Sequence, residues 1–246
     1  MQALLHTAGR WLIGVLMALS VLQLYFVVRI GAMRYVDPQS SAFERSQTWR
    51  IASQSGKPFA WRQEWMPYAQ ISDHLKRAVI ASEDGDFIYH DGVEWEALEK
   101  AWQKNAQTQQ QQLKRNPQSK SRAPKIVGGS TITQQLAKNL FLSGERTMAR
   151  KAQEFLLTLA LEILLSKQRI LEIYLNHVEW GDGIFGAEAA AQHYYHKSAS
   201  KLSPTEAARL AVMLPRPKYF EKLPNSVYVA NRTQTILQRM SDADLP

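Results

Sequence analysis

The strongest hydrophobic pattern in the chain lies near its amino-terminal end. The segment WLIGVLMALSVLQLYFVV (residues 11–28) runs for 18 residues without a charge. A helix of that length is about long enough to cross a ~30 Å hydrocarbon core. Trp11 and Tyr25 lie near its two ends, where aromatic rings favour the membrane interface. The pattern predicts a transmembrane helix over residues 10–30.

A cleaved signal peptide and a buried core helix are the alternatives for this segment. No small-x-small cleavage site follows Val28, and Arg29 and Arg34 interrupt the region where one is expected. We therefore interpret the segment as an uncleaved anchor behind a short tail of residues 1–9. Arg10 and the terminal amine balance the two arginines beyond the span, so the positive-inside rule does not decide the orientation.

Beyond the anchor, the periodicity predicts a polar, aromatic-containing connector over residues 31–70 and one helical domain over residues 71–246. Apolar residues recur at helical spacing after Ser72. Thr131 with Gln134, and Ser203 with Glu206, have the spacing of capping boxes at helix starts. Further helices are predicted over about residues 147–165, over residues 167–176 and near the carboxyl end, and glycine turns at Gly181, Gly183 and Gly186. The predicted fold class is mainly α.

Composition describes a globular protein, with 45% hydrophobic and 21% charged residues. The chain has no cysteine, which excludes disulfides and thiolate metal sites and leaves the redox compartment open.

The net charge of +8 is concentrated in residues 100–144, which hold eight lysines and arginines and no acidic residue. Such a stretch predicts an anionic partner, either nucleic acid, anionic lipid headgroups or a phosphorylated substrate. The anchor favours the last two, and the stretch lacks the interleaved aromatics typical of nucleic-acid binding. Its low-complexity part, residues 107–125, is predicted to be a loop.

Candidate chemistry begins at an acidic run after the apolar residues 79–81. Glu83, Asp84 and Asp86 lie within four residues, and like charges this close raise the proton affinity of one member. Phe87 and Tyr89 are expected to shield that carboxylate from water. The run therefore predicts a base poised near neutral pH, and the alternative is an ordinary polar helix end.

A second candidate is Glu154, which shares a helix face with Arg150 and Lys151, with Arg146 one turn earlier. One interpretation is a solvated, salt-bridged surface. The other is an anion clamp for phosphate oxygens, to which Lys138 would also belong. Ser130 and Thr131, at a helix start, would add hydroxyl and N–H donors for a phosphate or a sugar.

Five ordered segments carry a family resemblance. They are Glu83-Asp84-x-x-Phe87-x-x-His90-x-Gly92, Gly129-Ser130-Thr131-Ile132-Thr133-Gln134-Gln135-x-x-Lys138-Asn139, Arg150-Lys151-x-x-Glu154, Lys167-x-x-Ile170-Leu171-x-x-Tyr174-Leu175-Asn176 with the three following glycines, and Arg232-Thr233-Gln234-Thr235-Ile236-Leu237. Together they resemble the peptidoglycan glycosyltransferases (glycosyltransferase family 51), in particular the monofunctional, membrane-anchored members. Two departures are Thr233, where the family often has a second basic residue, and the long polar stretch 107–125.

The resemblance implies a lysozyme-like α fold with a membrane-facing lobe. It implies polymerisation of lipid II into glycan strands, with Glu83 as general base and release of undecaprenyl pyrophosphate. Attack on an α-linked diphosphate gives a β-1,4 bond with inversion. Glu154 matches the family's second glutamate, which positions the pyrophosphate or a divalent cation (Mg or Mn). The phosphoglycolipid moenomycin, which inhibits this family, is expected to bind.

We predict two further groups of site residues. Residues expected to contact substrate are Asp84, Ser130, Thr131, Gln134, Gln135, Lys138, Asn139, Arg146, Arg150 and Lys151. Residues expected to support the cleft are Phe87, His90, Tyr174 and Asn176.

The resemblance also implies a single-pass protein of the bacterial inner membrane with a periplasmic catalytic domain. Its expected partners are lipid II, the growing glycan, membrane lipids and proteins of cell-wall synthesis or division, and not nucleic acid. The rival functions are a lytic enzyme of the same fold class and a non-enzymatic anchored scaffold. Hydrolysis has no use for a cationic clamp, and a scaffold has no use for the two glutamates in these contexts.

Overall fold

The computed structural model describes residues 2–53, 61–95, 99, 103, 107, 130–142, 144–145 and 147–246, without the side chains of residues 2–5 and 8. The helices are α1 (Gln2–Ala32), α2 (Ala42–Ala52), α3 (Asp73–Glu83), α5 (Ile132–Phe141), α6 (Met148–Leu164), α7 (Lys167–His177), α8 (Ala187–Tyr195), α9 (Pro204–Met213), α10 (Pro217–Phe220) and α11 (Val227–Arg239). Two 3-10 turns, η1 (Tyr68–Gln70) and η2 (Ala199–Lys201), and three short strands, β1 (Arg62–Gln63), β2 (Glu179–Gly181) and β3 (Ile184–Phe185), complete the described elements.

The predicted helices and their starts are confirmed. Both capping boxes form, with Thr131 and Gln134 at α5 and Ser203 and Glu206 at α9. These reciprocal contacts satisfy backbone N–H groups that have no partner inside the helix. The described part of the chain is mainly helical, as predicted.

The connector contains secondary structure for which the sequence analysis made no prediction. It contains α2, which starts with its own capping box between Ser41 and Glu44. Glu44 is buried and its Oε1 lies 2.8 Å from Nδ1 of buried His177, which joins α2 to α7. The connector also contains β1, which pairs in parallel with β3 of the glycine-rich region. Strand β3 pairs in antiparallel with β2 of the same region. The connector is therefore part of the folded domain.

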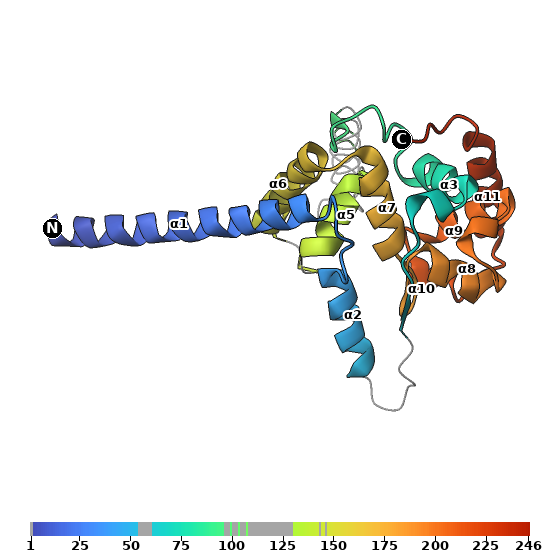
Figure 1. Cartoon of the computed structure of the whole chain (residues 1–246), viewed down its shortest axis with the longest axis horizontal. Coiled ribbons are helices and arrows are strands. Elements are labelled where there is room, and N and C mark those ends of the chain that lie inside the picture. The colour runs from blue at the N-terminus through green and yellow to red at the C-terminus, as the bar shows by residue number, and fades with distance from the viewer. Residues whose placement is uncertain are drawn as a thin grey trace.

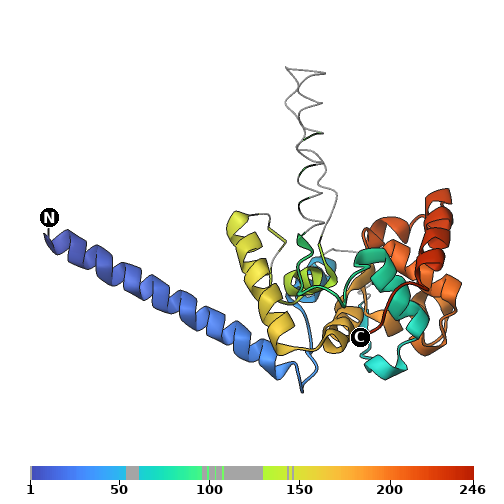
Figure 2. The ribbon, with the colours of Figure 1, turned by 90° about the horizontal axis from the view of Figure 1, so that it is seen from above.

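The predicted anchor, residues 10–30, lies within helix α1, which is continuous from Gln2 to Ala32. Its apolar stretch, Gly9–Ala32, is long enough to cross a membrane and none of its most apolar 18-residue window is buried. Figures 1 and 2 show α1 projecting from the body of the molecule and meeting it only at its carboxyl-terminal end, beside α6.

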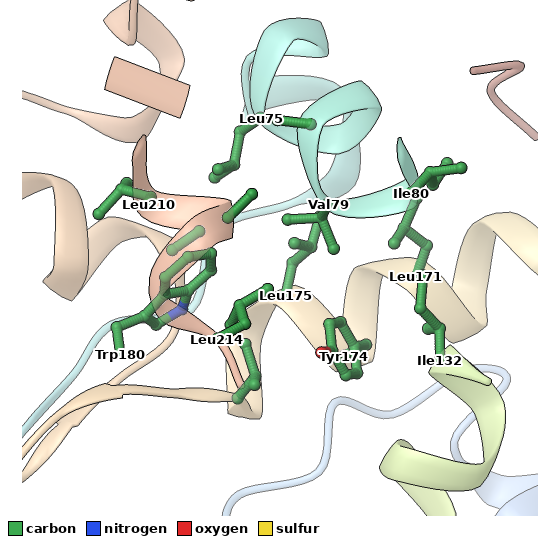
Figure 3. Close-up of a cluster of buried hydrophobic side chains, with 14 of the residues drawn as sticks. Leu75, Val79, Ile80, Ile132, Leu171, Tyr174, Leu175, Trp180, Leu210 and Leu214 are labelled. Carbon is green, nitrogen blue, oxygen red and sulfur yellow. The ribbon is translucent and has the colours of Figure 1, made fainter. Parts of the chain in front are cut away.

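Helix α7 joins the two halves of the domain. Helices α5 and α6 pack together on the side of α1, whereas α3, α9 and α11 pack together on the other side (Figure 1). Figure 3 shows Leu171, Tyr174 and Leu175 of α7 in the middle of the buried cluster. Ile132 of α5 lies at one end of that cluster, and Trp180 and Leu210 lie at the other. The core therefore holds α5 and α3, which carry two of the predicted motifs, against one helix.

Candidate active site

Glu83 is the last residue of α3, where the helix leaves the core and the chain turns away. Its carboxylate accepts hydrogen bonds from Gln135 Nε2 at 3.0 Å and from Ser82 Oγ at 3.4 Å. Burial raises the pKa of Glu83, whereas these two donors and the positive charge of Arg232 oppose the shift. The raised pKa makes Glu83 a stronger base than an ordinary carboxylate, which suits it to accept a proton.

The cause of this pKa shift differs from the predicted one. The neighbouring charge of Asp84 raises the pKa of Glu83 less than burial does. Phe87 is fully buried, as expected of a supporting residue, but Tyr89 is 71% exposed and donates to Asp244 Oδ2 at 2.5 Å. Tyr89 therefore does not shield Glu83, and the packing of α3 against α9 and α11 provides the burial instead.

A hydrogen-bond relay orients the side chain that meets Glu83. Tyr174 Oη donates to Gln135 Oε1 at 3.0 Å, which turns the amide nitrogen of Gln135 toward Glu83. Burial raises the pKa of Tyr174 well above its ordinary value, so its phenol stays protonated and remains a donor. These contacts fit the supporting role predicted for Tyr174, and they place Gln135 beside the candidate base.

Asp84 and His90 fasten the loop after Glu83 to α5. The Asp84 carboxylate lies 2.7 Å from His90 Nε2 and accepts from the backbone N–H of Ile132 at 2.8 Å. His90 Nδ1 in turn accepts from the N–H of Gly92 at 3.0 Å, which leaves Nε2–H to donate a hydrogen bond to Asp84. Both oxygens of Asp84 thus contact protein groups. We interpret this predicted substrate-contacting residue as a positioning residue.

The start of α5 is likewise engaged in local contacts. Thr131 Oγ1 donates to the Gly92 carbonyl at 2.6 Å, and Thr131 and Gln134 cap the helix. Ser130 is exposed, and its carbonyl accepts from Gln135 Nε2 at 3.4 Å. Of the predicted substrate contacts at this helix start, Ser130 is the one left accessible.

Asn176 supports the cleft from the far end of α7. Its Oδ1 accepts from the N–H of Met66 at 2.7 Å, and its Nδ2 donates to the Met66 carbonyl at 2.9 Å. The two bonds tie the segment before η1 to α7. The predicted supporting role of Asn176 fits these contacts.

The predicted cationic cluster forms between α5 and α6. Glu154 is 3% exposed; its Oε2 accepts from Arg150 Nη1 at 3.0 Å and its Oε1 pairs with Lys151. Lys138 is exposed as a residue, but loss of water around its ammonium lowers its pKa, and the charges of Glu154 and Glu83 oppose that shift. Among the described residues, no carboxylate lies within ion-pair distance of Lys138. Within the described part of the cluster, the Lys138 ammonium is therefore unpaired, whereas Arg150 and Lys151 are paired with Glu154.

A cavity of about 270 Å³ opens beside this cluster. It is lined by Phe43, Lys138, Asn139, Leu142, Gly144, Glu145 and Arg150. In the described part of the chain, Arg150 Nε is buried and has no hydrogen-bond partner. A buried donor without a partner costs stability unless a ligand satisfies it.

Some of the predicted site residues lie outside the described residues. They are Arg146, Gly129 before Ser130, and nearly all of the predicted basic loop.

A second cavity, of about 400 Å³, opens at Glu83. It is lined by Ala81, Ser82, Glu83, Asp84, Gly85, Asp86, Glu94, Arg239, Asp242 and Ala243. Arg77 binds the Ala243 carbonyl, so the residues after α11 fold back against α3.

The sequence analysis missed two groups that line the candidate site. One is Phe43, for which the capping box at Ser41 was the available signal. The other is the carboxyl-terminal segment, for which the sequence carried no signal.

The residues around Glu154 do not fit a protein-held divalent cation. Both of its oxygens accept from cationic side chains, and two positive charges at this distance oppose a third. No group of three or more His, Cys, Asp or Glu side chains suited to a metal occurs among the described residues.

Comparison with known proteins gives one consistent result. A family model described as Transglycosylase matches residues 51–241. A biosynthetic peptidoglycan transglycosylase of Burkholderia thailandensis is 50% identical over 240 residues, which cover 97% of this chain and 84% of the relative. Proteins of the same name from Herminiimonas arsenicoxydans (48% identical, 96% of each chain) and Cupriavidus metallidurans (46% identical, 100% of each chain) match over their whole lengths or nearly so.

Proposed function

The chain belongs to the transglycosylase family, the peptidoglycan glycosyltransferases of cell-wall synthesis, and we propose that it polymerises lipid II into β-1,4-linked glycan with release of undecaprenyl pyrophosphate. The observation that carries the proposal is that helix α5 joins a carboxylate suited to act as a base to a cavity lined by cations. The partly buried carboxylate of Glu83 lines one cavity and accepts from Gln135 of α5. Lys138, three residues later on the same helix, lines the cationic cavity. A base and an anion site are what this transfer requires.

The proposed reaction is a single inverting displacement. Glu83 removes the proton from the 4-hydroxyl of the acceptor sugar, and that oxygen bonds to the anomeric carbon of the donor. The α-linked bond from that carbon to the diphosphate breaks, and undecaprenyl pyrophosphate leaves with the electron pair. Attack from the opposite face gives the β-1,4 bond without a covalent glycosyl-enzyme.

The cationic cavity suits the leaving group. Lys138 supplies an unpaired ammonium, and Arg150 supplies a guanidinium whose Nε is free in the described part of the chain. We assign Glu154 a positioning role, because it holds Arg150 and Lys151 at the rim of the cavity. Fixed cations that meet charge as it develops lower the barrier more than mobile ones do.

We further propose that α1 spans the inner membrane and that the α5–α6 end of the domain meets the periplasmic surface. The exposed side of α6 carries Met148 (86% exposed), Leu156 (50%) and Ile163 (80%), which recur near helical spacing. An apolar face beside a membrane-length helix fits contact with lipid. The cationic cavity then lies at the depth of lipid headgroups.

The function is tested by incubating the purified full chain in detergent with lipid II and separating the products by size. Polymer that a muramidase cuts back to disaccharide units supports the proposal. Shortening of pre-formed glycan without synthesis from lipid II would instead indicate the lytic alternative.

The pH dependence of activity tests the Gln135 contact. A general base must be ionised, so activity falls as pH drops through the pKa of Glu83. Gln135→Leu removes a donor that lowers this pKa, so the acid limb of kcat/KM is expected to move to higher pH by about 0.5–1 unit. Tyr174→Phe, which only releases Gln135, is expected to give a smaller shift in the same direction. An acid limb that stays in place in Gln135→Leu would remove this amide from the control of Glu83.

Phe43 provides a test of the cationic cavity from the connector side. Phe43→Ala removes an apolar wall and admits water to the cations, so kcat/KM for lipid II is expected to fall about three- to tenfold. Trp49→Ala is the matched control, because Trp49 lies on the same helix and is 77% exposed. Equal activities of the two variants would mean that α2 does not contribute to the donor site.

A further inference from the structure

One face of the anchor helix is turned toward the domain. Gln23, Phe26 and Ile30 follow one another at three- and four-residue spacing, which places them on one side of α1, and Met33 comes directly after the end of the helix. Gln23 and Phe26 are partly buried, and Ile30 and Met33 are 0% and 4% exposed. The residues before Gln23 are largely exposed. The last three turns of α1 therefore belong to the fold, while the earlier turns do not.

Gln23 makes the most specific of these contacts. Its Nε2 donates to Gln153 Oε1 at 2.7 Å, and Gln153 Nε2 donates back to Gln23 Oε1 at 3.1 Å. An amide within an apolar span is unfavourable in lipid unless its polar atoms are paired. The reciprocal pair satisfies both amides and holds α1 at one position along α6.

The same face of α1 also holds the end of α5. The rings of Phe26 and Phe141 meet edge to face with centroids 5.5 Å apart, and the Arg29 guanidinium lies 5.2 Å from the centre of the Phe141 ring. Phe141 is the last residue of α5, one turn after Lys138. The anchor thus touches both helices of the cationic cavity.

Arg169 fixes the exit of the anchor. Its Nε donates to the Met33 carbonyl at 2.8 Å, and its guanidinium also binds Asp37 at 2.7 Å. Phe141 of α5 and Arg169 hold the carboxyl-terminal part of α1 in place. A rotation of α6 against α5 would therefore break the Gln23–Gln153 pair. The contact is therefore suited to keep the two helices in one arrangement.

We propose that Gln23 and Gln153 are positioning residues of the glycosyltransferase site: through them the anchor helix holds α6 against α5 and so sets the spacing of Lys138 and Arg150. This inference rests on the proposed function. It assigns to the anchor a part in the geometry of the donor site that is separate from tethering the enzyme to the membrane.

Gln23→Leu separates the two roles, because it makes the span more apolar while it removes the amide pair. In detergent, where tethering contributes little, Gln23→Leu and Gln153→Leu are each expected to lower kcat/KM for lipid II about three- to tenfold and to weaken moenomycin binding by a similar factor. Ser20→Leu, an exposed position on the same span, is the matched control and is expected to match the parent. The double variant is expected to lose no more than the larger single loss, since the two side chains act as one contact.

Melting temperatures are measured alongside, and Gln153→Leu carries the same test if Gln23→Leu does not fold. Losses that multiply in the double variant overturn the pairing, and parent-level kinetics or moenomycin affinity in both single variants overturn the positioning role. Polymer formation by the parent tests the proposed function on its own. A parent that makes no polymer contradicts that function, whereas an active parent with unaffected variants contradicts only this inference.

Discussion

Replacement of Glu83 by Gln is expected to lower the turnover of lipid II polymerisation by about 10²- to 10⁴-fold. Glutamine keeps the size of the side chain and an oxygen that accepts from Gln135, but it cannot take the proton of the acceptor hydroxyl. Burial raises the pKa of Glu83, which means that the fold disfavours its ionised form at neutral pH. A neutral glutamine removes this penalty, so the melting temperature is expected to stay the same or to rise slightly.

Glu94→Gln is the matched control for this experiment. Glu94 lines the same cavity but makes no contact with Gln135, so its loss removes a charge without removing the base. Parent-level turnover is expected for Glu94→Gln. Full activity in Glu83→Gln, measured as polymer formed per enzyme per unit time, would take Glu83 out of the mechanism. A large loss in both variants would point to the charge of the cavity instead of one base.

Local pattern predicted the helices that carry their own start signals and apolar periodicity, but not the elements that depend on distant contacts. The capping signals at Thr131 and Ser203 predicted two helix starts because an N-cap depends on residues three apart in sequence. The same signal at Ser41 was available, yet α2 was missed because its apolar side is short and the helix depends on tertiary contacts such as that between Glu44 and His177. The short sheet was missed for a related reason, since β1 pairs with a strand more than a hundred residues away.

The candidate site shows the same division. The motif pattern brought Glu83, Gln135 and Tyr174 to attention, but not that they form one relay from three helices. Asp84 resembled a substrate ligand in sequence, and only its contacts with His90 and Ile132 give it a positioning role. Gln23 gave no signal, because one amide in an apolar run does not reveal its partner 130 residues later. Sequence identified the chemistry, and packing determined the role of each residue.

Replacement of Lys138 by Ala is expected to lower the catalytic efficiency on lipid II by about 10- to 100-fold, which follows from the loss of one charge-assisted contact to phosphate. The structure favours Lys138 over its neighbours for this effect. Arg150 and Lys151 already share the carboxylate of Glu154, whereas no described carboxylate is within ion-pair distance of Lys138. Lys138 is thus the cation in the described cluster that is most available to an incoming pyrophosphate.

Lys138→Arg keeps the charge and is expected to recover part of the activity, while Lys201→Ala, an exposed lysine of η2, is the control for general loss of positive charge. Moenomycin carries a phosphate in place of the pyrophosphate, so its affinity is expected to weaken in Lys138→Ala and to stay at the parent level in Lys201→Ala. A hydrolase acting on finished glycan, which has no phosphate, would show no such dependence on Lys138. Hence the variant is expected to lose synthesis without gaining glycan cleavage, and unchanged polymerisation together with unchanged moenomycin affinity would place the leaving group outside the cavity between α5 and α6.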